Sequence, residues 1–196
     1  MKHFFVQGTS AFLGFTFWGA GMVKLYAGHN FIQWIGPPWL VERLAEFDLG
    51  LYAQFIAVCQ ICIGFMLITT RYKLLGSIML VPMILNILMV TISQHWRGTP
   101  YVLGVLLAMN FFILWQYKNY FIPILNETSL IRKNQRKSSK TILGHLVWLC
   151  GLGLCLVSVS VSYYNLIPAF IMAGMGLIAG ILSFKLDRNY TIVRYS

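Results

Sequence analysis

The chain has 196 residues, of which 58% are hydrophobic and 10% are charged, against roughly 25% charged residues in an ordinary soluble domain. A soluble domain of this length could bury one core, but it could not hide this much apolar sequence. The formal net charge of +10 comes from 15 Lys and Arg against 5 Asp and Glu. These basic residues fall mainly between apolar segments, so their pattern does not indicate nucleic-acid binding.

Six apolar segments of roughly 19–23 residues are each long enough to cross a bilayer as a helix. The first is too long and too aromatic for a signal peptide, so we expect it to stay in the membrane. The sequence predicts an all-α integral membrane protein with a four-helix transmembrane bundle and a C-terminal transmembrane hairpin. The six segments are 4–26, 49–69, 74–94, 101–120, 142–163 and 166–184. The expected units are 1–120 for the bundle, with an outer interfacial segment at 28–48, then a basic cytoplasmic loop at 121–141, and 142–196 for the hairpin and tail.

The positions of the basic residues predict the orientation. Three of them, Lys24, Arg43 and Arg97, fall on one side of the six segments, and the other twelve fall on the opposite side. The positive-inside rule places the more basic side, with both termini, in the cytoplasm. We therefore expect an N-in, C-in protein of the plasma membrane, specifically a bacterial inner membrane. The twelve are Lys2, Arg71, Lys73, Lys118, Arg132, Lys133, Arg136, Lys137, Lys140, Lys185, Arg188 and Arg194.

The long outer connection predicts a short amphipathic helix at the membrane surface. Pro37 and Pro38 prevent a helix from continuing through them. After the prolines, Leu40, Leu44 and Phe47 fall on one helical face and charged residues fall largely on the other. Trp34 and Trp39 would anchor this segment at the interface.

Small residues predict two places of close helix packing. In the first segment, Ser10, Gly14, Phe17, Gly21 and Lys24 recur at helical spacing on one face. This small face would let a neighbouring helix approach and would turn Lys24 into the bundle, although Lys24 is also near enough to the surface to extend to it. In the last segment, the pattern Gly176-x-x-x-Gly180 favours close approach. Packing within the chain is the expected use of this pattern, and a homodimer seam is the alternative.

Polar residues inside apolar segments are the candidate site residues. Lys24, Gln60, Asn86 and His95 form our candidate set for binding a cofactor or ligand head group. Gln54 and Asn110 are better explained by hydrogen bonds between helices. No residue spacing indicates a metal site, and no nucleophile–base pair indicates the catalytic residues of a self-sufficient enzyme.

Cys59 and Cys62 form a C-x-x-C pattern within the second segment. Such a pair could serve as the thiols of a membrane disulfide oxidoreductase. Its depth argues against that function, because desolvation disfavours thiolates, and no second cysteine pair lies in an outer connection. Apolar packing is the favoured interpretation.

Residues 10–120 resemble the DoxX-like family of small four-helix membrane proteins. The resemblance rests on the Gly21-x-x-Lys24 ending of the first segment and on the run Gln60-Ile-Cys-Ile-Gly-Phe-Met-Leu-Ile-Thr-Thr-Arg71. The family usually has Glu where this chain has Gln60, and because an amide cannot titrate, a proton-linked role does not carry over. The resemblance implies a four-helix bundle and an association with quinone-linked redox complexes; other members of the wider group are similar to chaperones or cargo receptors.

These observations lead to two functional expectations. The first is an integral membrane subunit of a redox-linked assembly that holds a quinone, with the lipid bilayer and other membrane or periplasm-facing subunits as partners and no nucleic acid. The protein would position the cofactor, which would carry the electron chemistry. The alternative is a non-enzymatic membrane subunit that binds or stabilises a partner protein complex. A cavity behind Lys24 would favour the first expectation, and a solidly packed interior would favour the second.

Overall fold

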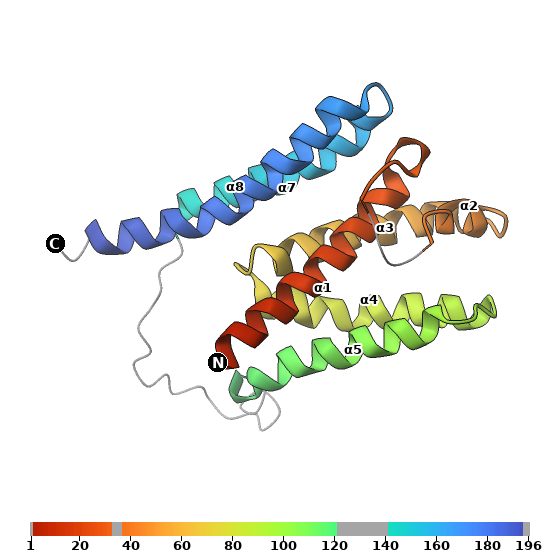
Figure 1. The fold of residues 1–196 in the computed structure, drawn as a ribbon, viewed down its shortest axis with the longest axis horizontal. Helices are drawn as coiled ribbons and strands as arrows, with labels where there is room; N and C mark the ends of the chain where they lie inside the picture. The colour runs from red at the N-terminus through yellow and green to blue at the C-terminus, as the bar shows by residue number, and fades with distance from the viewer. Residues whose placement is uncertain (1, 33–36, 121–140, 194–196) are drawn as a thin grey trace.

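The computed structural model describes residues 2–32, 37–120 and 141–193 (Figure 1). Within these ranges the regular structure is all helical, with no strand, which confirms the all-α part of the expected fold class. The elements are α1 (Lys2–Leu25), η1 (Ala27–His29), α2 (Leu40–Ala45), α3 (Gly50–Ile68), α4 (Lys73–Ser93), α5 (Thr99–Gln116), α7 (Ile142–Ser162) and α8 (Leu166–Val193).

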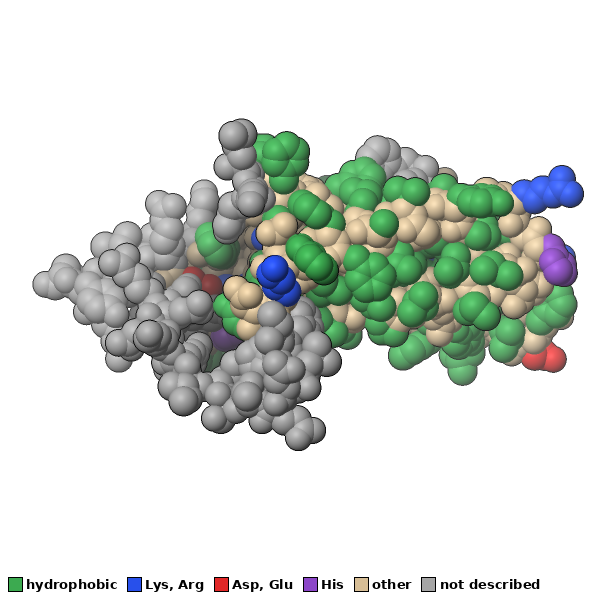
Figure 2. Space-filling model, turned by 90° about the horizontal axis from the view of Figure 1, so that it is seen from below, with side chains coloured by type: hydrophobic (Ala, Val, Ile, Leu, Met, Phe, Trp, Pro, Cys, Tyr) green, Lys and Arg blue, Asp and Glu red, His purple; other side chains and the backbone are tan. Residues whose placement is uncertain are grey.

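Five described helices are long and apolar enough to cross a membrane: α3, α4, α5, α7 and the part of α8 from Leu166 to Phe184. Each of these stretches has 18–21 residues, which as α-helix spans roughly the 30 Å hydrocarbon core. Figure 2 shows hydrophobic side chains along the sides of the described helices, with charged and histidine side chains toward the two ends. This distribution indicates a multi-pass membrane protein.

Helix α1 has 24 residues, but it is not among these five helices because its apolar content is lower. Glycine, serine and threonine occupy many of its positions. It nevertheless forms part of the bundle of α1, α3, α4 and α5, called the first bundle below, where it lies antiparallel to α3 (Figure 1). The residues from Leu13 to Lys24 are mostly buried. Packing against other helices therefore stabilises α1, whose sequence is less apolar than that of a typical lipid-facing helix.

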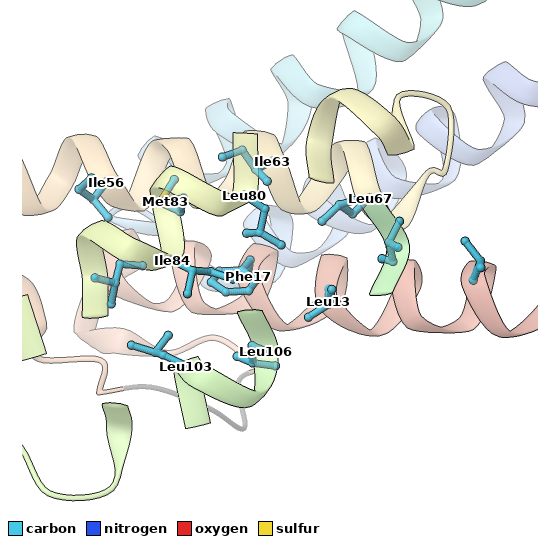
Figure 3. Packing of buried hydrophobic residues seen from close by; sticks show 13 residues of the cluster. Leu13, Phe17, Ile56, Ile63, Leu67, Leu80, Met83, Ile84, Leu103 and Leu106 are labelled. Atoms are coloured by element: carbon cyan, nitrogen blue, oxygen red, sulfur yellow. The ribbon is translucent and has the colours of Figure 1, made fainter. Parts of the chain in front are cut away.

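Helices α1, α3, α4 and α5 share one apolar core. Figure 3 shows Phe17 of α1 close to Ile84 of α4 and Leu106 of α5. These residues are at most 3% exposed. A bundle of this composition leaves little room for polar groups, so the polar side chains that do enter it mark special positions.

The outer segment between α1 and α3 folds back onto the bundle. Leu40 and Leu44 of α2 are buried against Ala53 of α3, and the Trp39 and Trp96 rings lie 5.2 Å apart. The predicted amphipathic helix is thus present, but it is shorter than expected. Phe47 lies beyond its end and is 51% exposed instead of buried with the leucines. Trp34 lies outside the described residues.

The second helical pair packs as a hairpin whose contacts lie within the chain. A Cβ atom added at Gly176 would lie 2.5 Å from the carbonyl oxygen of Gly151 on α7. One added at Gly180 would lie 2.5 Å from the Phe65 ring on α3. The Gly176-x-x-x-Gly180 pattern therefore serves packing within this chain, on α7 and on the first bundle.

Candidate functional site

The candidate site depends on a close crossing of α1 and α3. A Cβ atom at Gly14 would lie 2.5 Å from the backbone nitrogen of Ile68, and one at Gly21 would lie 2.6 Å from the carbonyl oxygen of Ala57. From the other side, a Cβ at Gly64 would lie 2.7 Å from the carbonyl oxygen of Gly14. The predicted small face of α1 thus packs on α3, at a separation that only glycine permits.

This crossing brings Lys24, in the last turn of α1, against Gln60 of α3. The Lys24 ammonium donates to the Gln60 side-chain oxygen at 2.9 Å and to the carbonyl oxygen of Ala20 at 2.9 Å. Lys24 is 7% exposed and Gln60 is 3% exposed. The side chain therefore turns back into the bundle instead of extending to the nearby surface. An ammonium group has three N–H donors, and these two acceptors use two of them.

No described carboxylate neutralises Lys24. Where the structure describes acidic side chains in ion pairs, Glu42 contacts His29, Glu46 contacts Arg43 and Asp187 contacts Arg71. The partners of Lys24 within the described chain are thus both uncharged oxygens. A cation that is buried beside neutral groups alone is costly unless something else compensates it.

A cavity of about 140 Å³ lies next to this pair. Its walls come from α1, α3, α4 and α5, and Pro37 and Leu40 of the outer segment also line it. At its rim, Trp96 and Thr99 are half-buried and Val102 is 40% exposed. The lining residues are Thr16, Phe17, Ala20, Lys24, Pro37, Leu40, Gln60, Ile87, Thr91, Trp96, Thr99, Val102, Leu103 and Leu106.

His29 holds the outer segment beside the cavity. Its Nδ1 lies 3.1 Å from the carbonyl oxygen of Val23, near the end of α1, and its Nε2 lies 2.7 Å from Glu42 of α2. A carbonyl can only accept a hydrogen bond, so Nδ1 is the donor. This link fixes α2, and with it Leu40, near the end of α1.

The structure brings together two of the four candidate residues. Lys24 and Gln60 are in contact and line the cavity. Asn86 is exposed on α4, where it accepts a hydrogen bond from Tyr52, and it lines a different hollow between α3 and α4. His95 is exposed in the α4–α5 turn with a φ of 55° and does not line the cavity. Asn110, assigned to interhelical hydrogen bonding, donates to the carbonyl oxygen of Ser77 at 2.9 Å.

Cys59 and Cys62 are both partly buried free thiols on α3. Cys59 packs against the core of the first bundle. Neither residue lines the cavity beside Lys24. The apolar-packing interpretation agrees with these positions, and the thiols stand apart from the candidate site.

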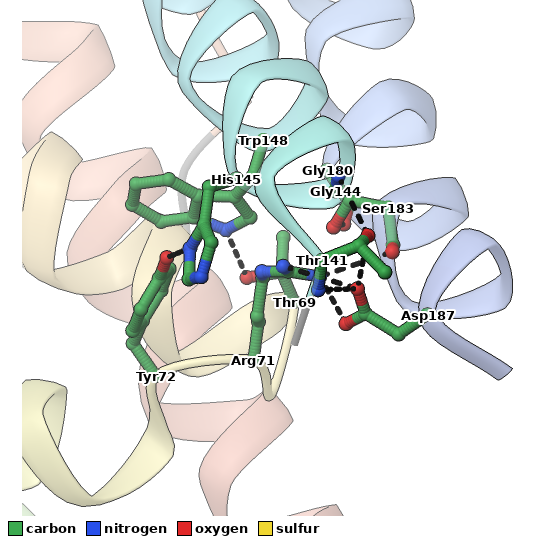
Figure 4. A network of polar contacts seen from close by, with 10 residues as sticks. All are labelled: Thr69, Arg71, Tyr72, Thr141, Gly144, His145, Trp148, Gly180, Ser183 and Asp187. Atoms are coloured by element: carbon green, nitrogen blue, oxygen red, sulfur yellow. Dashed lines mark hydrogen bonds and ion pairs between the residues drawn. The ribbon is translucent and has the colours of Figure 1, made fainter. Parts of the chain in front are cut away.

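A second polar cluster, which the sequence did not indicate, links the α3–α4 turn to the hairpin (Figure 4). Arg71 donates to Asp187 of α8 at 2.6 and 3.3 Å and to the carbonyl oxygen of Ser183 at 3.0 Å. The Trp148 indole of α7 donates to the Thr69 hydroxyl at 2.9 Å. The last apolar segment was expected to end at Phe184, whereas α8 continues to Val193 and carries Asp187 into this cluster.

The environment of Asp187 favours its ionised form. Burial alone would raise the pKa of this carboxyl group. Hydrogen bonds from the Thr141 backbone and hydroxyl, both 2.9 Å, and the guanidinium of Arg71 outweigh burial and hold the pKa below its ordinary value. Thr141 also caps α7, where its hydroxyl accepts from the Gly144 backbone, so one carboxylate joins two helices and a turn.

The opposite end of the hairpin has its own polar link. The Tyr26 hydroxyl, just after α1, donates to the Ser158 hydroxyl at 2.8 Å, and the backbone N–H of Ala27 donates to Ser162 at 3.1 Å. Tyr26 is 2% exposed. The hairpin is therefore attached to the first bundle at both ends.

Comparisons of the chain with protein-family models, curated proteins and solved structures give no match. The functional conclusion therefore rests on the geometry of the cavity and its polar wall.

Proposed function

We propose that this chain is an integral membrane subunit of a redox-linked assembly and that it holds a quinone, or a lipid of similar shape, in the cavity beside Lys24. The observation that carries the proposal is the position of Lys24. It is a buried cation with neutral partners, in the wall of a cavity. A ligand whose head group accepts hydrogen bonds would use the remaining donor of the ammonium group.

The direction of the Lys24 side chain supports this function. A lysine near the end of a membrane helix can extend its ammonium group to the surface, whereas one held at the centre of a helix costs about 2.5–3.5 kcal/mol on insertion scales. Lys24 lies in the last turn of α1, yet its ammonium group bonds to Ala20 and Gln60 instead. A bound head group would offset the cost of this inward position.

The proposed topology has six crossings, with α1 as the first, and both termini in the cytoplasm. It is supported by the antiparallel packing of α1 on α3 and by the positions of the chain ends, since the start of α1 and the end of α8 lie toward the same end of the molecule (Figure 1). In this orientation the cavity lies in the outer half of the bilayer. A membrane-soluble molecule would reach it past Trp96, Thr99 and Val102.

The quinone would carry the electron chemistry, and the protein would bind and orient it. Lys24 and Gln60 are placed to donate hydrogen bonds to the oxygen atoms of its ring. The apolar walls formed by Phe17, Leu103 and Leu106 would contact the ring and exclude water. These residues supply binding and orientation without any covalent step.

The test is purification in mild detergent followed by mass spectrometry of co-purified lipids and proteins. We expect quinone to co-purify with the wild type and to fall sharply per mole of inserted protein in Lys24→Met. Lys24→Arg should also lose ligand, because a planar guanidinium does not replace a compact ammonium in a shaped site. Lys118→Met is the matched control, because Lys118 is exposed and packs over Trp115, away from the cavity.

Equal quinone content in the wild type and all three variants would remove Lys24 from the site. A protein partner recovered in constant ratio with no quinone in any sample would replace this proposal with the alternative, a non-enzymatic membrane subunit that stabilises a complex.

A further inference from the structure

Lys24 and Gln60 keep hydrogen-bond donors that no described residue accepts. Lys24 has one N–H beyond those used by Ala20 and Gln60. Gln60 uses its side-chain oxygen to accept from Lys24, which leaves its amide N–H₂ group as a donor with no acceptor among the described residues. Two donor groups from neighbouring helices therefore face the same small space.

Among the described residues, the two threonines deep in the wall do not accept from these donors. The Thr16 hydroxyl donates to the carbonyl oxygen of Phe12 at 2.9 Å, and the Thr91 hydroxyl donates to that of Leu88 at 2.9 Å. Both are bonds to the preceding turn of the same helix. Most of the remaining lining is apolar, so the site offers donors and one positive charge to a group that can accept.

We infer that the head group bound in this cavity is an anion, with an ionised oxygen placed between the Lys24 ammonium and the Gln60 amide. The inference rests on the proposed function, since it names the chemical class of ligand for that same site. Without a carboxylate among its described neighbours, Lys24 leaves a net positive charge in an apolar environment, where an opposite charge is attracted far more strongly than in water. An ionised oxygen would also give the Gln60 amide a charge-assisted hydrogen bond, and bonds in which the donor or the acceptor is ionised are roughly twice as strong as neutral ones.

The size of the cavity limits the head group. A dry cavity of about 150 Å³ in another protein binds a benzene ring, and the cavity here is about 140 Å³. One ring, or one carboxylate with the first atoms of its chain, would fill it. The tail would leave by the Trp96, Thr99 and Val102 rim. Two sources of this anion fit: the enolate of a hydroxylated benzoquinone, and the carboxylate of a fatty acid.

The experiment compares two matched pairs of probes in mild detergent. One pair is an alkylated 2-hydroxy-1,4-benzoquinone, ionised at neutral pH, and its methyl ether. The other is a long-chain fatty acid and its methyl ester. Dissociation constants are taken from thermal-shift titrations of the wild type, Lys24→Met, Gln60→Leu and the control Lys118→Met.

We expect the anion of at least one pair to bind the wild type and Lys118→Met about tenfold or more tightly than its uncharged partner, as charge-assisted hydrogen bonds predict. Lys24→Met should abolish that ratio, and Gln60→Leu should weaken the anion while keeping part of the ratio. The pair with the larger ratio identifies the source as quinone or fatty acid. The ratio of anion to uncharged-probe affinity can be measured in the wild-type protein alone. Poor folding of Lys24→Met would therefore not obscure the main result.

Equal binding within both pairs in the wild type overturns the inference. If the neutral quinone ether binds well and quinone co-purifies, the proposed function stands and only the anionic class is wrong. If no probe binds and nothing co-purifies, the proposed function fails as well. A ratio that persists in Lys24→Met also overturns the inference, because the charge that it invokes is then absent.

Discussion

Arg71 and Asp187 are 116 positions apart in the sequence and form a two-bond ion pair, with nitrogen–oxygen distances of 2.6 and 3.3 Å. The Arg71 side chain is fully buried and that of Asp187 is 10% exposed. The pair joins the α3–α4 turn of the first bundle to the extended end of α8. A buried charge that loses its partner is strongly destabilising, so this contact makes the two parts of the chain depend on each other.

Asp187→Asn should destabilise the protein by about 3–5 kcal/mol, the usual range for breaking a buried pair. The amide keeps an acceptor for Thr141, so the main loss is the counter-ion of Arg71. Arg71→Met should cost less, because Asp187 retains its hydrogen bonds from Thr141. The measurement is unfolding in detergent. Arg43→Met, which breaks the exposed pair with Glu46, is the control and should change stability by about 0–1 kcal/mol.

The stabilisation from Asp187 should depend on pH. Its native pKa lies below its ordinary value, so the unfolded chain takes up the proton first as the pH falls. The contribution of ionised Asp187 to the free energy of unfolding is therefore fully present above the unfolded pKa of about 3.9. It is lost as the pH falls through the lower native pKa. The difference in melting temperature between wild type and Asp187→Asn should be constant near neutral pH and shrink below about pH 4. A gap that widens on acidification would contradict this assignment.

Gly64→Ala should disrupt the crossing of α1 and α3. Its Cβ would meet the backbone of Trp18 and lie 2.7 Å from the carbonyl oxygen of Gly14. Backbone atoms cannot move aside as the end of a side chain can. The loss of folding free energy should therefore be about 3 kcal/mol or more, the top of the usual 1–3 kcal/mol for overpacking. Gly153→Ala on α7 is the control, because nothing lies within 4 Å of its added Cβ, and it should gain about 0.5–1 kcal/mol. Melting temperature and the folded fraction in detergent distinguish the two.

Changing both Cys59 and Cys62 to Ala should leave ligand binding intact. Neither lines the cavity, and both are free thiols. Removing the sulfur atoms should cost on the order of 1 kcal/mol each through small cavities. Co-purified quinone per mole of folded double variant is the measurement. A folded double variant without ligand or activity would instead favour the disulfide-oxidoreductase interpretation.

Thiol labelling tests the proposed orientation. In a background without the four native cysteines, Arg97→Cys in the α4–α5 turn should react with an impermeant reagent on intact cells. Ser138→Cys, in the basic connection before α7, should react only after the cells are opened. Equal labelling on intact cells would exclude the N-in, six-crossing arrangement.

The parts predicted well are those that depend on local pattern. Apolar length located every long helix of the described chain, and the spacing of Ser10, Gly14, Gly21 and Lys24 correctly gave the inward face of α1. The sequence indicated only that Lys24 faces the bundle and that Gln60 could line a cavity; their contact with each other appears first in the structure.

The parts predicted less well depend on rotation and on long-range register. Depth alone suggested that Asn86 was a cavity residue, but depth does not say which side of α4 it occupies, and it faces away from the cavity. The Arg71–Asp187 pair was missed for another reason. The basic connection between the bundle and the hairpin carries no periodicity that would align the two parts, and Arg71 already had an explanation as an orientation signal.

The close crossing of α1 and α3 at Gly14, Gly21 and Gly64 also sets an order of events during synthesis. Residues 10–24 of α1 make their closest contacts with residues 57–68 of α3, which the ribosome adds later. Until those residues exist, the least apolar of the long helices has no surface to pack on. A nascent chain that stops before residue 68 should therefore hold its first helix weakly, and the binding site can form only after most of the first bundle has been made.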